Sequence, residues 1–323
     1  MKIAVAGASG RLGRKFVQYC KKKKIPAIAL VRSKNSLRFL PKKADCKLTD
    51  YSNPGNLKKS LEGITHIVNI TGATDTTIPK KEMYNANMLA TKRILDAAPP
   101  SLEKFIHISS IAVYGKNING IADENYPKNP KDAYGKSKFE GEKLALLFKD
   151  KFNVIVLQPG IIYGKEFREG FYPILRNIKN KEMRIIGNGK NYVPLVHVDD
   201  IVNAIAKSVS AKINSGSTYI LVATPSLTQL QLVETAAQML GVDIPKKHIS
   251  PMAAKFAIYA KMLWAKVSKK KHSLTGEMID QLACNRLFSP EKAKKELGWK
   301  STIPFKIGIE KVVMQFLDES KKG

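Results

Sequence analysis

The stretch Ile3-Ala-Val-Ala-Gly7-Ala-Ser-Gly10-Arg-Leu-Gly13 decides the fold of this chain. Its first four residues are apolar and predict a buried strand, and the amphipathic run at 12–23 predicts a helix directly after it. Three glycines at a spacing of three connect the two elements. A glycine-rich turn between a buried strand and a helix is typical of the first unit of an open parallel α/β sheet.

Five more apolar runs, rich in β-branched residues, recur along the chain. They lie at 27–31, 66–70, 105–109, 154–157 and 219–222, and amphipathic stretches at 57–62, 83–98 and 134–148 lie between most of them. This alternation predicts a parallel sheet covered by helices on both faces, with its ligands at the carboxyl ends of the strands. The expected fold class is therefore α/β, a doubly wound parallel-sheet Rossmann fold.

The turn after the first strand has the composition of a phosphate-binding loop. Gly7 allows the tight turn, Gly10 lets the backbone approach a pyrophosphate, and Gly13 allows close packing of the helix. The N-terminus of the helix adds unpaired N–H groups and the positive end of its dipole. The sequence therefore predicts a dinucleotide site. The alternative is a glycine turn that binds no ligand.

The domain organisation follows from a change of pattern after about Gly164. From Pro225 onward the chain is mainly helical, with several prolines between the helical stretches. We expect residues 1–165 to form the dinucleotide-binding Rossmann domain, to which residues 195–224 return. Residues 166–194 and 225–323 are expected to form a smaller, mainly helical substrate-binding lobe.

The end of the second strand bears on the choice of cofactor. It carries Arg32 and Lys34 but no acidic residue that would bind the adenosine ribose of NAD. Arg32 lies 19 residues after Gly13 and can form a forked contact with a 2′-phosphate, with Arg11 or Lys34 as a helper. We therefore expect a preference for NADP(H). The alternative is NAD(H), with Arg32 as an ordinary surface residue.

The run Tyr134-Gly-Lys-Ser-Lys138 offers proton-transfer chemistry. On a helix, positions i and i+4 place the phenol and the ammonium on one face, about 6 Å apart along the axis. A cation beside a tyrosine favours the phenolate and lowers its pKa. Ser110 follows the apolar run at 105–109 and can hold a substrate oxygen near Tyr134. The alternatives are a solvent-facing helix pair and a turn-forming serine.

Together these motifs resemble those of the extended short-chain dehydrogenase/reductases, also called the NAD-dependent epimerase/dehydratase family. The glycine loop and the segments at 109–115 and 134–138 match the family in order and spacing. Further matches lie at 87–91, 158–164, 196–200 and 289–299, so the likeness covers nearly the whole chain.

The resemblance implies roles for particular residues. Tyr134 is the expected acid/base, and Lys138 is expected to lower its pKa and hold the nicotinamide ribose. Ser110 would orient the reacting oxygen, and Asn87 would support the site. The residues expected to bind the cofactor are Gly7, Ser9, Gly10, Arg11, Leu12, Gly13, Arg32, Leu48, Thr71, Gly72, Tyr134, Lys138, Pro159 and Ile162. Relatives often dimerise through helices like those at 83–98 and 134–148, so a homodimer is expected.

Several positions depart from relatives that act on nucleotide sugars. Val193 lies four residues before His197, where such relatives often carry an arginine that clamps the diphosphate. Gln158 replaces another common arginine, and Arg286 is not part of a clear Arg-x-x-Asp pattern. A buried diphosphate without a forked partner would be poorly held. We therefore expect a small-molecule substrate other than a diphosphate sugar.

Residues 251–271 combine an apolar face with many lysines. The apolar face comprises Phe256, Tyr259, Met262, Leu263 and Val267 at helical spacing. A core-packed helix of the second lobe is the first interpretation. The second is an apolar lid over a lipophilic substrate, as in relatives that resemble dihydroflavonol reductases or 3β-hydroxysteroid dehydrogenases. Contact with an anionic membrane surface is the least favoured.

The charge balance is strongly basic, at a formal net charge of +28. Of the 55 basic residues 46 are lysine, which is the solvated cation, and they are scattered along the chain. This indicates a solvated surface and no specific nucleic-acid site. The three cysteines lack metal-ligand spacing, no apolar run reaches 18 residues, and the chain enters its first strand without a leader pattern. We expect a cytoplasmic protein without a metal site.

We therefore predict an NAD(P)-dependent oxidoreductase that transfers hydride to or from a ketone or secondary alcohol, with Tyr134 as the acid/base. One alternative is a sugar or nucleotide-sugar epimerase or dehydratase that retains its cofactor. An alternative of another class is a catalytically silent dinucleotide sensor or assembly subunit. The presence of Ser110, Tyr134 and Lys138 together argues against that role.

Overall fold

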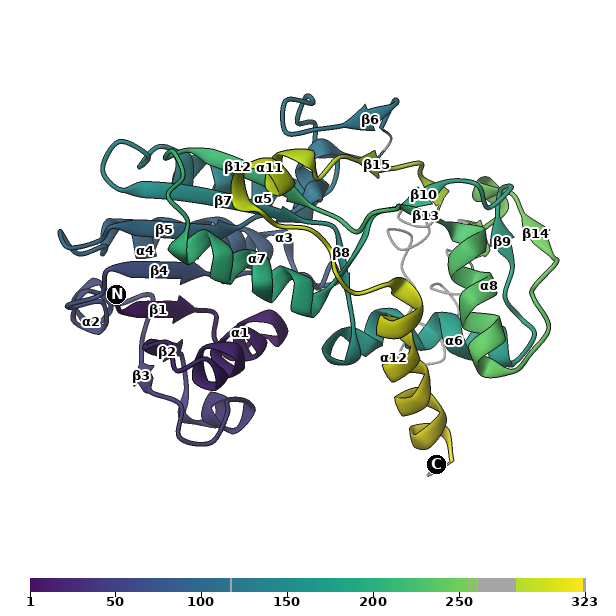
Figure 1. The fold of residues 1–323 in the computed structure, drawn as a ribbon, viewed down its shortest axis with the longest axis horizontal. Helices are drawn as coiled ribbons and strands as arrows, with labels where there is room; N and C mark the ends of the chain where they lie inside the picture. The colour runs from purple at the N-terminus through teal and green to yellow at the C-terminus, as the bar shows by residue number, and fades with distance from the viewer. Residues whose placement is uncertain (117, 255, 258–259, 261–282, 322–323) are drawn as a thin grey trace.

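A seven-stranded, all-parallel sheet forms the centre of the molecule (Figure 1). The computed structural model describes residues 1–321 except 117, 255, 258–259 and 261–282. In spatial order the strands are β12 (Ser217–Leu221), β7 (Asn153–Pro159), β5 (Lys104–Ile108), β4 (His66–Asn69), β1 (Ile3–Ala6), β2 (Ala27–Val31) and β3 (Cys46–Leu48). The strand order reverses at β1, and this is the doubly wound arrangement that the sequence predicted.

Helices cover both faces of the sheet. One face carries α1 (Arg11–Lys22), α7 (Val198–Ser210) and α11 (Glu291–Leu297), and the other carries α2 (Pro54–Ser60), α4 (Ala90–Asp96) and α5 (Ala133–Leu146). In β1 the side chains of Ile3 and Val5 enter the first core, whereas Ala4 and Ala6 enter the second. The strand is apolar at every position because both of its faces are buried.

A smaller lobe extends from the carboxyl edge of the sheet (Figure 1). It contains η4 (Lys165–Gly170), α6 (Tyr172–Lys179), α8 (Gln229–Leu240) and α12 (Phe305–Ser320). Its core includes Leu175, Val233 and Ile309. Short strand pairs also stand outside the central sheet: β8 (Ile161–Tyr163) with β11 (Leu195–His197), β9 (Ile185–Ile186) with β14 (His248–Ile249), β10 (Tyr192–Val193) with β13 (Leu227–Thr228), and β6 (Ile121–Ala122) with β15 (Leu287–Phe288).

The C-terminal segment differs from the expected organisation. The sequence assigned 225–323 to the second lobe, but Ala293, Leu297 and Trp299 pack in the core beneath α1 and α7. The indole of Trp299 is fully buried and donates a 2.8 Å hydrogen bond to the carbonyl oxygen of Asp200. The chain therefore returns to the central sheet at 291–299 before α12 re-enters the lobe.

The apolar face predicted over 251–271 falls largely outside the described residues. Tyr259, Met262, Leu263 and Val267 belong to the part that is not described, and Phe256 is 77% exposed. Over the described residues, no helix combines the length and hydropathy needed to cross a membrane.

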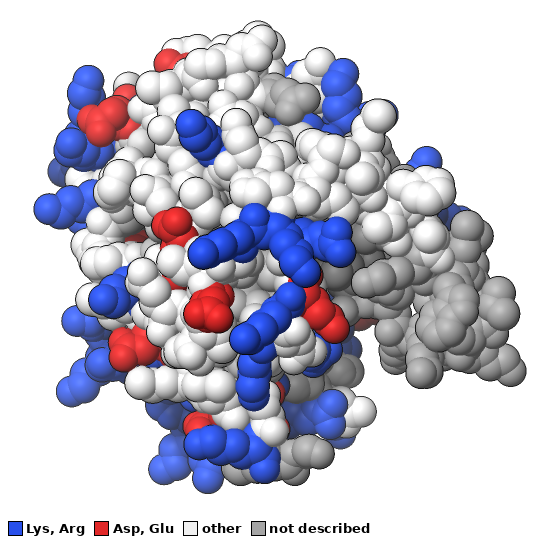
Figure 2. Space-filling model, turned by 90° about the vertical axis from the view of Figure 1, so that its right-hand side faces the viewer, with Lys and Arg blue, Asp and Glu red and all other residues white. Residues whose placement is uncertain are grey.

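Basic side chains are spread over the surface. Figure 2 shows Lys and Arg dispersed over the side of the molecule that bears α8, with Asp and Glu among them. Two lysines of the described residues, Lys104 and Lys138, are exceptions because both are buried. Lys104 is 8% exposed, and its ammonium donates to the carbonyl oxygens of Ser208, Val209 and Ala211 at the end of α7. A cation at the C-terminus of a helix stabilises it.

Candidate active site

The glycine loop between β1 and α1 is built for close approach. A Cβ atom on Gly13 would lie 2.2 Å from the carbonyl oxygen of Gly7, so only glycine fits there. Helix α1 has Gly10 as its N-cap residue and no side-chain cap, whereas α5 is capped by the carboxylate of Asp132. The first-turn N–H groups of α1 therefore suit the phosphates of a dinucleotide.

Tyr51 joins this loop, although the sequence gave no reason to select it. Its hydroxyl accepts a 3.4 Å hydrogen bond from the N–H of Gly7, and burial raises the pKa of Tyr51 to about 12. The positive charge of Arg32 partly opposes that rise in pKa. Arg32 is exposed at the end of β2, beside the loop, as a contact with an adenosine phosphate would require.

The other residues expected at the cofactor have varied environments. Leu12 is 6% exposed and packs into the core, which leaves its backbone for a ligand. Leu48 ends β3 and is 54% exposed. Ser9 and Ile162 are half-buried, and Pro159 is buried at the end of β7.

Ser110, Tyr134 and Lys138 converge at the carboxyl edge of the sheet. Ser110 follows β5, and its hydroxyl is hydrogen-bonded to the phenol of Tyr134. Tyr134 and Lys138 lie one turn apart on α5, whose start is fixed by the Asp132 cap. Lys138 is 5% exposed and donates to the carbonyl oxygen of Ile108. The structure thus brings together the three residues that the sequence selected for proton transfer.

The direction of the tyrosine pKa differs from the sequence prediction. Burial raises the pKa of Tyr134, and the hydrogen bond from Ser110 opposes that rise. Lys138 is not among the groups that shift this pKa in the structure, where its ammonium is directed to the Ile108 carbonyl, so the lowering expected from Lys138 stays a prediction. Burial therefore favours the protonated, proton-donating form of the Tyr134 phenol.

Burial also acts on the lysine of the pair. It lowers the pKa of Lys138 to about 8, while the negative charge of Glu142 works in the opposite direction. A Cβ atom on Gly72 would lie 3.7 Å from Lys138 Nζ and 2.5 Å from Asn87 Oδ1. Gly72 follows β4, so the ammonium faces the segment that the sequence assigned to the cofactor.

Asn87 supports the site from behind. It lies in the π-helix η2 (Asn85–Leu89) and is fully buried. Its amide oxygen accepts from the N–H of Ala73 at 2.8 Å, and its amide nitrogen donates to Ala73 O at 3.1 Å and to Ser137 Oγ at 2.8 Å. One side chain thus connects the loop after β4 with α5, as the supporting role predicted from the sequence requires.

Glu142 is a residue of the site that sequence reasoning missed. It is fully buried on α5, forms an ion pair with Lys128, and accepts from Ser109 Oγ at 2.6 Å and Gln158 Nε2 at 2.9 Å. Its spacing from Lys138 is i+4, so it continues the face that carries Tyr134 and Lys138. That spacing was the feature of the sequence from which Glu142 could have been predicted. The buried carboxylate of Glu142 also explains why Gln158 occupies a position where relatives often carry arginine, because the Gln158 amide donates a hydrogen bond to that carboxylate.

Val193 has an apolar environment. It is 2% exposed and packs against Tyr163 and Leu195, so this position has no cation for a diphosphate. His197 nearby caps α7 by accepting from the N–H of Asp199 at 3.2 Å, and burial lowers its pKa. The segment around His197 is therefore structural, and it joins α7 to the lobe.

Comparisons with known proteins bear on the family of this chain. The family model described as NAD-dependent epimerase/dehydratase matches residues 3–221. The chain is 24% identical to the N-acetyl-alpha-D-glucosaminyl-diphospho-ditrans,octacis-undecaprenol 4-epimerase of Escherichia coli O157:H7, over 99% of this chain and 96% of that protein. It is 23% identical to the 4-hydroxy-2-methyl-3-oxo-4-farnesyl-3,4-dihydroquinoline-1-oxide ketoreductase of Stigmatella aurantiaca, over 96% and 95% of the two chains.

A solved structure shares the whole fold. The UDP-glucuronic acid 4-epimerase from Bacillus cereus, in complex with NAD, matches with a TM-score of 0.79 and 18% identity over 99% of both chains. The family model covers well over half of the chain, which confirms the family predicted from the motifs. The chain therefore belongs to the NAD-dependent epimerase/dehydratase family, and it is an enzyme of the extended short-chain dehydrogenase/reductase type that uses a nicotinamide dinucleotide.

Proposed function

We propose that this enzyme transfers a hydride to or from a carbon that bears a hydroxyl or carbonyl group, with Tyr134 as the acid/base. The observation that carries the proposal is the convergence of Ser110, Tyr134 and Lys138 beside Gly72. When bound, the nicotinamide supplies the hydride chemistry. Ser110 and Tyr134 hydrogen-bond the reacting oxygen, and Tyr134 donates the proton in the reductive direction.

In this proposal Lys138 places a positive charge beside Gly72, in the segment after β4 that is expected to contact the cofactor. Its buried ammonium faces Gly72 and is fixed by the Ile108 carbonyl. This placement supports contact with a ribose hydroxyl, since an ammonium has three N–H donors and one of them is directed to the Ile108 carbonyl within the described part of the chain. Asn87 keeps the loop after β4 and α5 at a constant separation.

Replacement of Tyr134 by Phe tests the mechanism. The variant keeps the ring but loses the proton, so turnover should fall at least about 10²-fold while cofactor affinity stays within about twofold. Activity would be measured on a carbonyl panel, and affinity by fluorescence titration with NADPH. Tyr19→Phe is the matched control, because that ring stacks on Phe16 away from the site. Retention of most activity in Tyr134→Phe would contradict the mechanism.

NADP(H) is the preferred cofactor in this proposal. Support comes from the exposed guanidinium of Arg32 beside the glycine loop and from the absence of a carboxylate at that position of β2. Arg32→Asp should weaken NADPH far more than NADH, since only NADPH carries the 2′-phosphate. Arg38→Asp, a nearby exposed arginine over the Phe39 ring, makes the same charge change as a control. Equal losses of affinity for NADPH and NADH in Arg32→Asp would show that Arg32 does not bind the 2′-phosphate.

A cofactor-retaining epimerase is the second candidate. It is favoured by the E. coli relative, which is named a 4-epimerase and matches nearly full length. A reductase oxidises one NADPH per turnover, whereas an epimerase shows no net change at 340 nm while product forms. Chromatography of the product alongside the absorbance trace separates the two.

A homodimer formed through η2, α4 and α5 is part of the proposal. These elements pack against one another on one face of the sheet, and Leu147 at the end of α5 is 74% exposed. Light scattering at several concentrations should give twice the chain mass. Leu147→Asp should shift that mass toward the monomer.

A further inference from the structure

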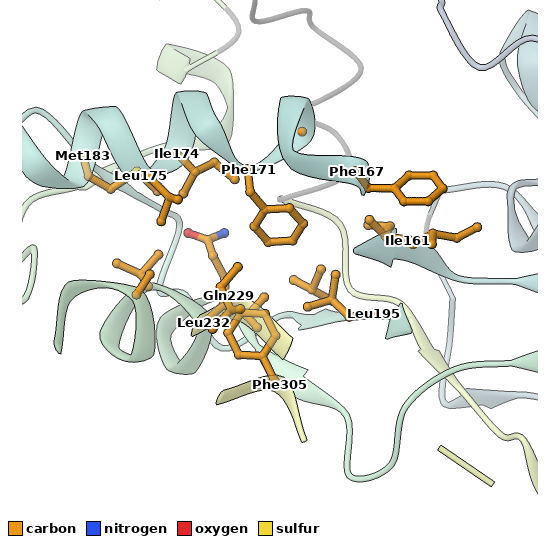
Figure 3. A pocket seen from close by; sticks show the side chains of 16 residues that line it. Ile161, Phe167, Phe171, Ile174, Leu175, Met183, Leu195, Gln229, Leu232 and Phe305 are labelled. Atoms are coloured by element: carbon orange, nitrogen blue, oxygen red, sulfur yellow. The ribbon is translucent and has the colours of Figure 1, made fainter. Parts of the chain in front are cut away.

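An apolar pocket lies between η4 and α6 on one side and α8 and α12 on the other. Its volume is about 130 Å³. Figure 3 shows the labelled side chains that surround it, among them Phe171, Ile174 and Leu175 from one side and Leu195, Leu232 and Phe305 from the other. We call this pocket the apolar subsite.

Among the described residues, the lining of the apolar subsite includes no charged side chain. Lys and Arg account for 55 of the 323 residues of the chain, yet none is among the sixteen lining residues. The polar side chain that lines it, Gln229, accepts from the N–H of Ile186 at 2.8 Å and donates to Asn191 Oδ1 at 3.3 Å. A phosphate or carboxylate placed here would lose its hydration without a compensating charge. An uncharged hydrocarbon group suits the lining.

The position of the apolar subsite connects it to the cofactor side of the molecule. Phe167 lines it, and the guanidinium of Arg11, the first residue of α1 after the glycine loop, lies 4.9 Å from the centroid of that ring. Ile161 and Ile162 also line it and follow directly on β7, at the carboxyl edge of the sheet. Gly170 lines it and is exposed, so the subsite reaches the surface at the end of η4.

We propose that the apolar subsite binds a hydrocarbon chain carried by the substrate, while the carbon–oxygen centre of the same molecule lies at Tyr134. This inference rests on the proposed function and narrows its substrate class to molecules with an alkyl or isoprenoid group. An apolar cavity of about 150 Å³ accepts benzene, so this subsite accepts about six carbon atoms. A longer chain would leave the subsite past Gly170.

A homologous series of primary alcohols, from 1-butanol to 1-decanol, serves as the probe. Binding to the NADPH-loaded protein is measured by calorimetry, without turnover. Affinity should rise about fourfold for each added methylene and should level off after about six carbons. A series with no dependence on chain length would overturn the proposal.

Two leucines of α8 give a matched pair of variants. Leu232 lines the apolar subsite, whereas Leu240 is a half-buried leucine of the same helix that packs in the lobe core away from it. Leu232→Phe should weaken 1-hexanol about tenfold, and Leu240→Phe should leave its affinity unchanged. Ile174→Ala enlarges the subsite, so the plateau should move two or three carbons further along the series, by about the volume removed. Equal effects of the two Phe variants would place the binding elsewhere.

Failure of this inference is distinguishable from failure of the proposed function. NADPH affinity and turnover of a short ketone, such as butan-2-one, report on the catalytic residues alone. Intact turnover together with alcohol affinities that do not depend on chain length would contradict the apolar subsite and leave the proposed hydride transfer in place. In the reverse result, Tyr134→Phe would show the expected rise of alcohol affinity with chain length and also full turnover. That result would support the apolar subsite and contradict the role of Tyr134 as the acid/base.

Discussion

A carboxylate buried near Lys138 influences the charge of that lysine. Glu142 has no exposed surface, and isolation of such a charge would cost several kcal/mol. Here the carboxylate is satisfied by Lys128, Ser109 and Gln158. Its negative charge counteracts the burial that lowers the pKa of Lys138 to about 8. The lysine therefore stays charged near neutral pH because a second buried charge lies one turn away.

Glu142→Gln should move the alkaline limb of activity to lower pH. The sign follows from burial, which disfavours the ammonium, so Lys138 loses its proton as the pH rises through about 8. Without the carboxylate, the pKa of Lys138 falls further. The measurement is kcat/KM against pH in the reductive direction, where both the ammonium and the phenol proton are needed.

The exposed carboxylate of Glu140 provides the control for this profile. It lies on the same helix and pairs with Lys143 at the surface. Glu140→Gln should leave the limb in place, because charges in solvent are screened. If the alkaline limb of the kcat/KM profile does not move in Glu142→Gln, in a variant shown to be folded, then the titration of Lys138 does not determine that limb.

Among the elements, those with local signals were predictable and those set by tertiary contacts were not. The strand before Gly7 and the helix after it could be predicted from apolar periodicity and from the glycines between them alone. The π-helix at 85–89 carries no periodic signal, since its extra residue per turn serves to place Asn87 between Ala73 and Ser137. Glu142 was missed for a similar reason, because its partners come from three other segments of the chain.

Asn87→Ala should uncouple the loop after β4 from α5. It removes the partner of the Ala73 N–H and the donor to Ser137, which costs about 1–3 kcal/mol of unfolding free energy. Lys138 and Gly72 would lose their fixed separation, and kcat should fall by up to about 10²-fold. Urea unfolding and steady-state kinetics measure the two effects. Asn85→Ala, at an exposed position of the same π-helix, should change neither by much.

At the scale of the whole molecule, the last part of the chain fastens the two lobes together. The sequence predicted a mainly helical region from Pro225 onward, and the pattern at 289–299 matched the family. Its return to the central sheet depends on Trp299 and Asp200, which are about a hundred residues apart and meet only in the folded chain. Gly308 of α12 also approaches Tyr163 and His197, where a Cβ would lie 2.7 and 2.9 Å from their rings. The lobe is thus held against the carboxyl edge that carries the site.

Asp200→Asn should loosen this attachment. The carboxylate is 2% exposed, and its oxygens accept from Thr302 N at 3.0 Å, Thr302 Oγ1 at 2.7 Å and Ile303 N at 3.3 Å. An amide supplies one acceptor oxygen and places N–H donors against the backbone donors, so about 1–3 kcal/mol of unfolding free energy should be lost. Asp199→Asn is the matched control, since that carboxylate is 45% exposed in its 3.2 Å pair with Lys15 and should contribute less than about 1 kcal/mol. Urea unfolding measures both variants. If the lobes are held through Asp200, the affinity for 1-hexanol should fall with stability in Asp200→Asn only, and equal losses in the two variants would contradict this role.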